Sequence, residues 1–458
     1  MNPDALSAQN SAETTRTVSL AQASRFWLQL GLVSFGGPAG QIALLHRELV
    51  ERRRWLSERR YLHALNYCML LPGPEATQLA TYLGWLLHGV PGGLIAGGLF
   101  LVPSVLVLTS LATIYALWGQ LPLLTAVFAL LKPAVLAIVV VAAWRLGQRT
   151  LHTRLLQLLA ALAFASLALL NVPYPLVVGL AALIGWTAGQ LQPQWIQRQT
   201  QGPVISPQGD GTDLPPAVHD DLTPTPAHAQ LSQRRLAVTL LVWGLATLLP
   251  LAALDHWGDE NGTLATMARF FSRVALLSFG GAYAVLPYVA QGAVDTFGWL
   301  SASQMVDGLA LGETTPGPLI MVVAFVGFMG GWNTGLGGGG GSGSLAAALA
   351  TTLVTVWFTF VPSFGFILAG APLVEASRGD LRLGAPLTAI TAAVVGVIAS
   401  LAVVFARPVL WPAGQVQPGA LVVLLLALWV QLRWRWSVMQ VIGAAAACGV
   451  GMAAIRPL

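Results

Sequence analysis

Four short motifs occur twice in this sequence, in the same order and at one constant spacing. Each motif of the first copy returns 244 positions later, as Pro72 does at Pro316. The pairs are Arg25-Phe26 and Arg269-Phe270, Ser34-Phe35-Gly36-Gly37 and Ser278-Phe279-Gly280-Gly281, Trp55-Leu56-Ser57 and Trp299-Leu300-Ser301, and Pro72-Gly73-Pro74 and Pro316-Gly317-Pro318. Four gapless matches rarely arise by chance, so we infer an internal duplication. The fold must therefore be built from two similar halves.

The composition places both halves in a membrane. The chain has 458 residues, of which 55% are hydrophobic and only 9% charged, whereas an average soluble domain has about 25% charged residues. Its mean hydropathy is +0.70. Apolar segments near or beyond the roughly 20 residues that cross a bilayer recur along it. We therefore expect an all-α polytopic membrane protein. The net charge of +5 comes from arginines clustered in loops, so it indicates orientation and not nucleic-acid binding.

Changes in composition predict five parts. Residues 1–24 form a polar tail without the compact apolar core of a cleavable signal. Residues 25–191 form the first repeat, residues 236–262 a connecting transmembrane helix and loop, and residues 263–458 the second repeat. Residues 192–235 gain Pro, Gln, Gly, Asp and Thr, which is typical of a disordered linker. A Gly/Ser run at residues 337–343 lengthens the second copy and is expected to be a flexible connector.

The positions of the arginines predict that the two copies are inverted relative to each other. The loop after the first Ser-Phe-Gly-Gly motif contains six arginines, whereas its counterpart at about 290–304 has no Lys or Arg. Short basic loops stay in the cytoplasm, and inverted repeats are the plan of many secondary transporters. If the leading broken segments re-enter the membrane and do not cross it, the loops with Arg145, Arg149 and Arg154 and with Arg378 and Arg382 also stay inside. We favour broken, re-entrant helices, with crossing helices as the alternative.

Glycine and proline interrupt both copies at equivalent points. Pro breaks the helical ladder, while Gly permits conformations and close approaches that other residues do not. A helix N-terminus at such a break offers N–H donors and a partial positive charge to an anion. Simple kinks and close helix packing are the alternative for any one motif. The candidate substrate-binding residues in the breaks are Ser34, Phe35, Gly36, Gly37, Pro72, Gly73, Pro74, Ser278, Phe279, Gly280, Gly281, Pro316, Gly317 and Pro318.

Ionisable residues inside apolar segments usually face a cavity or a partner. Glu75 follows the first Pro-Gly-Pro directly, and Glu313 precedes the second, at positions that are not repeat equivalents. Each is a candidate proton-coupling residue, and the alternative is that it caps local amide groups. Lys132, the only lysine in the chain, is a candidate substrate-binding residue. Pairing with Glu75 or snorkelling to an interface are its alternatives.

Other polar positions carry weaker signals. Arg25 and Arg269 are repeat equivalents that either bind anions or mark the membrane boundary, and we favour the boundary. Asp307 aligns with His63, and we expect ordinary hydrogen bonds between helices from both. No pattern indicates a nucleotide, haem or metal site, so we expect no cofactor, no metal and no catalytic residues.

The motifs resemble those of the chromate ion transporter (CHR) family, in its long two-domain form. The resemblance covers about 25–190 and 263–455. The stretches that carry it are Phe35-Gly36-Gly37-Pro38-Ala39-Gly40-Gln41-Ile42, His46 to Val50 with Trp55-Leu56, Leu71-Pro72-Gly73-Pro74-Glu75-Ala76-Thr77-Gln78-Leu79-Ala80, Ser278-Phe279-Gly280-Gly281 and Gly312-Glu313-Thr314-Thr315-Pro316-Gly317-Pro318. Membership implies a bacterial inner-membrane protein that exports chromate, a tetrahedral dianion, and so gives chromate resistance. Ala282 stands where the first copy has Pro38, so the copies are not interchangeable.

These observations predict a transporter and not an enzyme. The expected activity is export of chromate, coupled to inward proton flow, by alternating access between two inverted repeats. Transport of sulfate or another oxyanion is the main alternative, since backbone amides recognise charge and size better than the central atom, and a passive anion channel is a third. The expected partners are the oxyanion and membrane lipid, with a homodimer as an open alternative to a monomer.

Overall fold

Helices make up all the regular structure in the described part of the chain. The computed structural model describes residues 18–170, 172–191, 218, 226–258, 262–335, 343–377 and 384–455, and within these ranges it contains no strand. Six of the helices described there are long and apolar enough to cross a membrane. The prediction of an all-α polytopic membrane protein is therefore confirmed. The predicted N-terminal tail up to residue 17, most of the linker, residues 336–342 of the Gly/Ser connector, and Arg378 and Arg382 lie outside the described residues.

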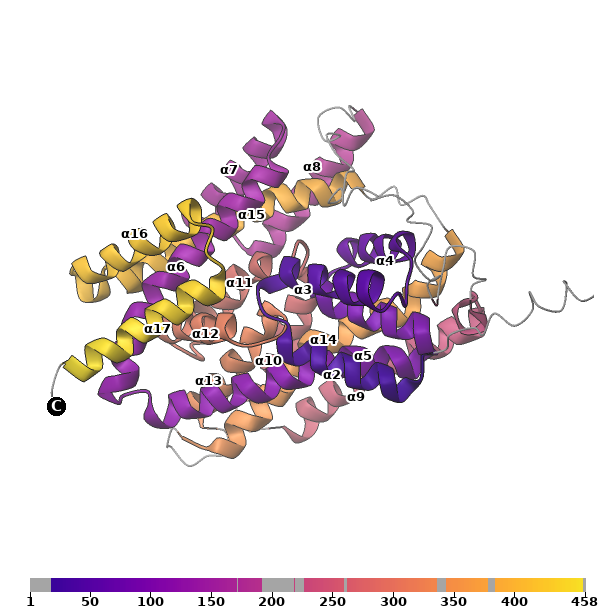
Figure 1. Ribbon diagram of the computed structural model, residues 1–458, viewed down its shortest axis with the longest axis horizontal. Coiled ribbons are helices and arrows are strands. Elements are labelled where there is room, and N and C mark those ends of the chain that lie inside the picture. Colours follow the sequence, from indigo (N-terminus) through magenta and orange to yellow (C-terminus); the bar gives the residue numbers. More distant parts are fainter. Residues whose placement is uncertain are drawn as a thin grey trace, which may run out of the picture.

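The first repeat consists of short broken helices followed by long ones (Figure 1). Its elements are α2 (Leu20–Val33), α3 (Gly37–His46), the π-helical turn η1 (Arg47–Arg52), α4 (Glu58–Leu70), α5 (Glu75–Trp118), α6 (Pro122–Thr150), α7 (Arg154–Ala168) and α8 (Tyr174–Leu191). The Ser-Phe-Gly-Gly motif separates α2 from α3, and the Pro-Gly-Pro motif separates α4 from α5. The sequence thus breaks its helices where Gly and Pro were expected to break them.

The second repeat follows the same order. The short turn η3 (Ala227–Ala229) and the connecting helix α9 (Gln233–Trp257) precede it, and its elements are α10 (Thr263–Leu277), α11 (Ala282–Ala290), η4 (Gln291–Thr296), α12 (Ala302–Thr314), η5 (Leu319–Met321), α13 (Val322–Thr334), α14 (Leu345–Ser377), α15 (Gly384–Leu410), η6 (Pro412–Gly414), α16 (Pro418–Arg433) and α17 (Val438–Ile455). The π-helical turns η1 and η4 recur at the spacing of the motifs. So do the serine caps at Ser57 and Ser301, which begin α4 and α12. The duplication is thus visible in local structure as well as in sequence.

One long helix of the first repeat corresponds to two helices of the second. Inside α5, His88 and Gly89 leave helical geometry, and Gly89 has a φ of +66°. The second repeat has α13 and α14 at the corresponding place, with residues 335–344 between them. The Gly/Ser run therefore falls where the first repeat has only a kink. The first part of α5 is thus a half-helix that begins at Pro-Gly-Pro, and its second part is the long helix.

Close contacts at glycine hold α13 against α14. A Cβ on Gly331 would overlap the backbone of Ala347 in α14, and a Cβ on Gly327 of the same helix would overlap Thr355. Gly327 and Gly331 form a small-xxx-small pattern, which lets two helices approach closely. Such close packing matters in a membrane, because burying apolar surface does not drive helices together there. Packing of α13 against α14 therefore depends on glycines.

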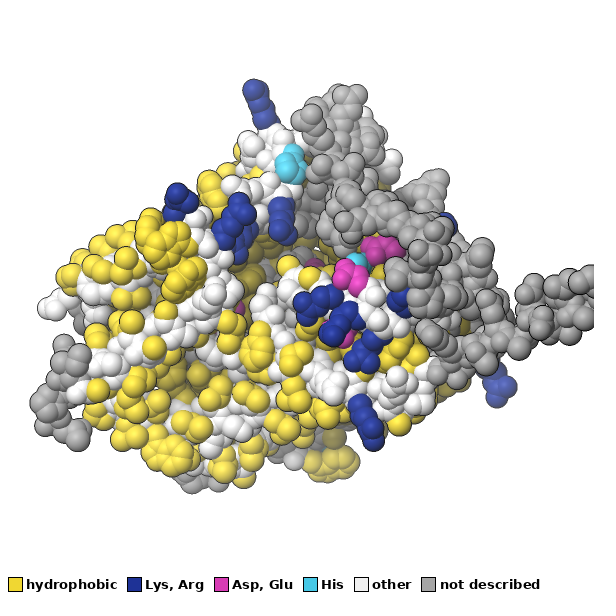
Figure 2. All heavy atoms as spheres, in the orientation of Figure 1, with side chains coloured by type: hydrophobic (Ala, Val, Ile, Leu, Met, Phe, Trp, Pro, Cys, Tyr) yellow, Lys and Arg dark blue, Asp and Glu magenta, His cyan; other side chains and the backbone are white. Residues whose placement is uncertain are grey.

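Much of the surface is apolar, as a lipid-facing surface must be. Helix α9 has no buried residue although its composition is apolar. Figure 2 shows hydrophobic side chains spread over the visible face. The basic side chains gather mainly over its upper half and centre and are sparse at the lower left, over α13 and α17.

Candidate functional site

The two repeats meet through reciprocal backbone hydrogen bonds between their breaks. The Gly73 N–H donates to the Ser278 carbonyl at 2.7 Å, and the Gly317 N–H donates to the Ser34 carbonyl at the same distance. Each bond joins the Pro-Gly-Pro of one copy to the Ser-Phe-Gly-Gly of the other. The two bonds are related by the 244-residue spacing at both ends. All four predicted breaks are therefore brought together at one place.

Each of the four breaks begins a helix whose N-terminus has no side-chain cap. The residues before the helices are Gly36 for α3, Pro74 for α5, Gly281 for α11 and Pro318 for η5, which leads into α13. By contrast, a serine side chain caps both α4 and α12. An uncapped N-terminus leaves N–H groups for another acceptor and carries partial positive charge. The arrangement suits a small anion.

Glycine is required at the centre of both Pro-Gly-Pro motifs. Gly73 has a φ of +132° and Gly317 a φ of +103°, a region that disfavours any residue with a Cβ. A Cβ on Gly73 would overlap the Ser363 hydroxyl, and a Cβ on Gly317 would overlap Ser104. Ser104 in α5 and Ser363 in α14 are repeat equivalents at a spacing of 259, because the Gly/Ser run lengthens the second copy before this point and Val102-Pro103-Ser104 matches Val361-Pro362-Ser363. The long helix of each copy therefore packs on the break of the other copy.

Two glutamines of the first copy donate to backbone carbonyls of the breaks, and one of them joins the two copies. The Gln41 side-chain amide donates to the Gly317 carbonyl at 2.5 Å and to the Ser34 carbonyl at 3.2 Å. The Gln78 amide donates to the Pro72 carbonyl at 2.7 Å. Both residues lie within the motifs that carry the family resemblance, which is the signal that could have identified them. Their counterparts 244 residues later are both valines, so the site is not symmetric in its side chains.

Several buried polar atoms around the breaks have no hydrogen-bond partner among the described residues. A buried polar atom without a partner is costly, so such a cluster indicates room for water or a ligand. The atoms are Thr77 Oγ1, Gln41 Oε1, Gln78 Oε1, Ser278 Oγ and Ser363 Oγ. Of these residues, sequence reasoning selected only Ser278. The hydroxyls can donate to an anion, whereas the two glutamine oxygens accept.

The two candidate coupling carboxylates lie at the same helix N-terminus. A Cβ on Gly281, the residue before α11, would lie 4.0 Å from Glu75 Oε1. Glu313 is buried and accepts a hydrogen bond from the Tyr283 hydroxyl, in the first turn of α11. Glu75 and Glu313 are therefore neighbours of one structural element although they are not repeat equivalents. The partial positive charge at the start of α11 favours negative groups, so both carboxylates lie where it can stabilise them.

Lys132 lies apart from the breaks and has a partner that the sequence did not suggest. Its ammonium lies 3.2 Å from Asp307 Oδ2 and donates to Ser303 Oγ at 2.7 Å. The Tyr115 hydroxyl also donates to Asp307 Oδ2, at 2.8 Å. Pairing of Lys132 with Glu75 was one of its predicted alternatives, and the structure gives the ion pair to Asp307. His63 contacts the Val374 carbonyl at 3.3 Å, a contact between helices as expected.

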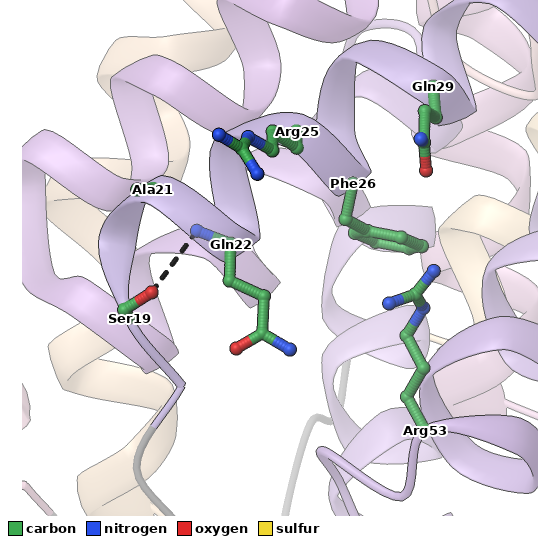
Figure 3. Close-up of a pocket in the computed structure, with 7 residues that line it drawn as sticks. All are labelled: Ser19, Ala21, Gln22, Arg25, Phe26, Gln29 and Arg53. Carbon is green, nitrogen blue, oxygen red and sulfur yellow. Dashed lines mark hydrogen bonds between the residues drawn. The ribbon is translucent and has the colours of Figure 1, made fainter.

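The equivalent residues Arg25 and Arg269 have different surroundings. Arg269 pairs with Asp255 at the end of α9. Arg25 lines a pocket of about 280 Å³ on α2, which Figure 3 shows together with Gln22, Phe26 and Arg53. The Arg53 guanidinium lies 4.6 Å from the centre of the Phe26 ring. Both arginines lie in the first halves of α2 and α10, whereas the breaks follow the last residues of these helices.

The Ser-Phe-Gly-Gly breaks of the two copies also differ in solvent exposure. Phe35 and Gly36 are exposed, whereas Phe279 is half-buried and Gly281 is buried. Ser34 is buried, and its hydroxyl donates to the Leu30 carbonyl at 2.6 Å. The first copy therefore presents an open break and the second a covered one.

Comparison with known proteins gives one consistent result. A model of the family described as "Chromate transporter" matches residues 21–186 and 265–450, one match for each repeat. A protein of Synechococcus elongatus named "Probable chromate transport protein" is 28% identical over 391 residues, which is 85% of each chain. A "Chromate transport protein" of Cupriavidus metallidurans is 26% identical over 405 residues (88% of this chain and 87% of that one).

A "Chromate transport protein" of Pseudomonas aeruginosa is 31% identical over 396 residues, covering 83% of this chain and 80% of that one. No solved structure matches. The family model covers more than half of the chain in two blocks that coincide with the two structural repeats. The chain therefore belongs to the chromate transporter family.

Proposed function

We propose that this protein is a secondary active transporter that exports chromate from the cytoplasm across the inner membrane in exchange for protons. The observation that carries the proposal is the meeting of four uncapped breaks through the reciprocal bonds of Gly73 and Gly317. Family membership and the names of three relatives support chromate as the substrate. The protein acts by binding and movement, without bond chemistry on the anion.

The dianion docks on the N-terminal amides of the half-helices. A tetrahedral oxyanion cannot cross hydrocarbon unless donors replace its hydration. The uncapped starts of α3, α5 and α11 supply backbone N–H groups, and the unpartnered hydroxyls of Thr77, Ser278 and Ser363 supply further donors. Backbone amides do not distinguish chromate from sulfate strongly, because the two anions share charge and shape. Sulfate is therefore expected to compete.

Movement of one repeat against the other gives alternating access. The breaks are joined by two equivalent bonds, so a rocking motion that loosens one side can leave the other in place. In this scheme Glu75 or Glu313 carries a proton on the empty carrier and is deprotonated in the loaded one, so the charged carboxylate and the bound anion must use separate N–H donors. The bound anion and the proton then move in opposite directions through one site.

Flux of chromate into inverted membrane vesicles tests the proposal. With an imposed proton gradient, vesicles that contain the native protein should accumulate chromate, and accumulation should stop when the gradient is collapsed. Glu75→Gln or Glu313→Gln should abolish gradient-dependent accumulation. Asp295→Asn, which removes an exposed carboxylate from η4, is the matched control and should transport normally.

Three outcomes would contradict the proposal in different ways. Accumulation that survives in both glutamine variants would exclude these carboxylates as the coupling groups. Leakage of chromate down its own gradient, without any effect of the proton gradient, would indicate a channel. Complete displacement of chromate by an equal concentration of sulfate would indicate a general oxyanion carrier.

A further inference from the structure

A polar cavity of about 580 Å³ lies away from the four breaks. It is bounded by the end of α5, the start of α6, the start of α12 and the end of α15 with the loop that follows. Its polar lining includes Tyr115, Gln120, Lys132, Ser303, Gln304 and Asp307. From Asp307 to Glu313 the distance along α12 is about 9 Å, since a helix rises roughly 1.5 Å per residue. The cavity is therefore separate from the central site.

The charged groups in this cavity have unused hydrogen-bonding capacity. The Lys132 ammonium has three N–H bonds, and among the described residues the structure pairs it with Ser303 and Asp307. Asp307 is only 3% exposed. Its Oδ2 faces Lys132 and Tyr115, while its Oδ1 is buried with no partner in the described part of the chain. The third ammonium N–H is therefore left for one more acceptor, whereas Asp307 Oδ1 would take a donor such as water.

We propose that this cavity is a second oxyanion site, in which Lys132 binds a tetrahedral dianion and Asp307 competes with that anion for the same ammonium. The inference rests on the proposed function, because it concerns the same class of substrate. In the empty site Asp307 neutralises Lys132. When an oxyanion arrives it must share the ammonium with a carboxylate, so its binding is weak and its release is fast.

The position of the cavity suits an exit site. The helix α6 begins at the cavity and ends near Arg145 and Arg149. Lys132 lies about 20 Å from Arg145 along the helix axis, at roughly 1.5 Å per residue. Arg407 lies beside the cavity, but Arg145, Arg149 and Arg154 gather at the other end of α6. Because arginines are enriched at the cytoplasmic ends of membrane helices, we place the cavity on the opposite face. An anion exported from the cytoplasm reaches this site last.

Comparison of the repeats supports different affinities at the two faces. The α12 residues Ser303, Gln304 and Asp307 occupy the places that Arg59, Arg60 and His63 occupy in α4. The start of α4 thus carries basic residues where α12 carries neutral ones and a carboxylate. A basic entrance attracts a dianion, whereas a neutralised lysine holds it weakly. This difference favours loading on the arginine-rich face and release on the other.

Thiol labelling tests occupancy of the cavity without depending on transport. Ala129 lines the cavity one helical turn from Lys132 and is exposed. The variant Ala129→Cys, in full-length protein with Cys448→Ala, is labelled from the extracytoplasmic side with a charged, membrane-impermeant thiol reagent. Sulfate is the probe, because chromate oxidises thiols, and chloride at equal ionic strength is the control anion. Sulfate should slow labelling, and chloride should not.

Two further variants in this background locate the binding group. Lys132→Met should abolish protection by sulfate. With Asp307→Asn added, half of the protection should be reached at a sulfate concentration about tenfold lower than in the Ala129→Cys, Cys448→Ala protein. The reason is that a carboxylate about 5 Å from a dianion weakens its binding about tenfold, even with the dielectric constant of water. Asp295→Asn should leave the sulfate dependence unchanged. A monodisperse peak in size-exclusion chromatography verifies that each variant is folded.

The outcomes separate this inference from the proposed function. The second site is overturned if sulfate protects neither the Ala129→Cys, Cys448→Ala protein nor its Asp307→Asn variant, or if protection persists in Lys132→Met. This holds even if vesicles accumulate chromate normally. An Asp307→Asn variant with unchanged sulfate dependence overturns the role of Asp307 as competitor. Failure of the native protein to accumulate chromate, with protection intact, contradicts chromate export and leaves the anion site established.

Discussion

Substitution of Gly317 by alanine tests the contact between the repeats most directly. Gly317 has a φ of +103°, and its Cβ would overlap both the hydroxyl and the Cβ of Ser104. The backbone strain costs about 1–3 kcal/mol, and the overlap in a packed interior about 1–3 kcal/mol more. Gly36 is the matched control, because its φ is +96° but a Cβ there meets nothing within 4 Å. Both substitutions cause similar backbone strain, but only Gly317→Ala causes an overlap. The free energy of unfolding of Gly317→Ala should therefore be ~1–3 kcal/mol lower than that of Gly36→Ala.

The measurement is reversible unfolding of the purified protein in mixed detergents, with chromate flux recorded on the same samples. A double-mutant cycle with Ser104→Gly identifies the source of the loss. The serine change alone removes the hydroxyl that donates to the Pro316 carbonyl and places glycine in a helix, at about 1 kcal/mol for each effect. In the double variant Gly317→Ala, Ser104→Gly the overlap disappears. The free energy of unfolding should therefore fall by about 1–3 kcal/mol less than the sum of the decreases in the two single variants. Additive losses, or equal stability of Gly317→Ala and Gly36→Ala, would refute the claim that Ser104 packs on this break.

Further substitutions test other parts of the structure. Gly73→Ala should destabilise the protein by about 1–3 kcal/mol from backbone strain. The added overlap should cost less than at Gly317, because the Cβ would meet the Ser363 hydroxyl and the end of the Gln78 side chain, which can move. A loss below about 1 kcal/mol would contradict the strained conformation at Gly73. Tyr283→Phe removes the hydrogen bond to Glu313, worth about 1.5–3 kcal/mol for a charged acceptor. The variant should slow proton-driven chromate uptake into vesicles while leaving the folded fraction unchanged. Normal uptake would exclude a coupling role for that bond. Arg269→Gln should alter stability by less than about 1 kcal/mol, because its ion pair with Asp255 is exposed, and should leave chromate flux intact. A large loss of flux in that variant would mean that the arginine binds the anion and does not merely mark the boundary.

The sequence predicted where the helices break but not what the breaks contact. Gly and Pro act on the local backbone, so the ends of α2 and α4 at Ser34 and near Pro72 followed from residue type alone. The constant spacing showed that Gly73 and Gly317 are equivalent. Equivalence says nothing about contact, so the bonds of each glycine to the opposite copy came only from the structure.

Side-chain partners were the part that sequence reasoning could not supply. Lys132 and Asp307 are 175 positions apart, and no local pattern connects them. Glu75 and Glu313 seemed unrelated because they are not repeat equivalents, yet both lie beside the start of α11. Long-range contacts of this kind depend on how helices pack, which a single sequence does not encode in any short segment.

The contrast between a symmetric backbone and asymmetric side chains bears on how export is driven. In the proposed mechanism, the two equivalent bonds at Gly73 and Gly317 would give the inward-facing and outward-facing states similar backbone energies, as alternating access requires. Unequal affinity at the two faces changes how fast an anion loads and leaves. It cannot change the equilibrium, because a carrier without a coupled ion only lets the anion run down its own gradient. In the proposed mechanism the direction of net export must therefore come from the protons on Glu75 or Glu313, while Lys132 and Asp307 set the rate of release.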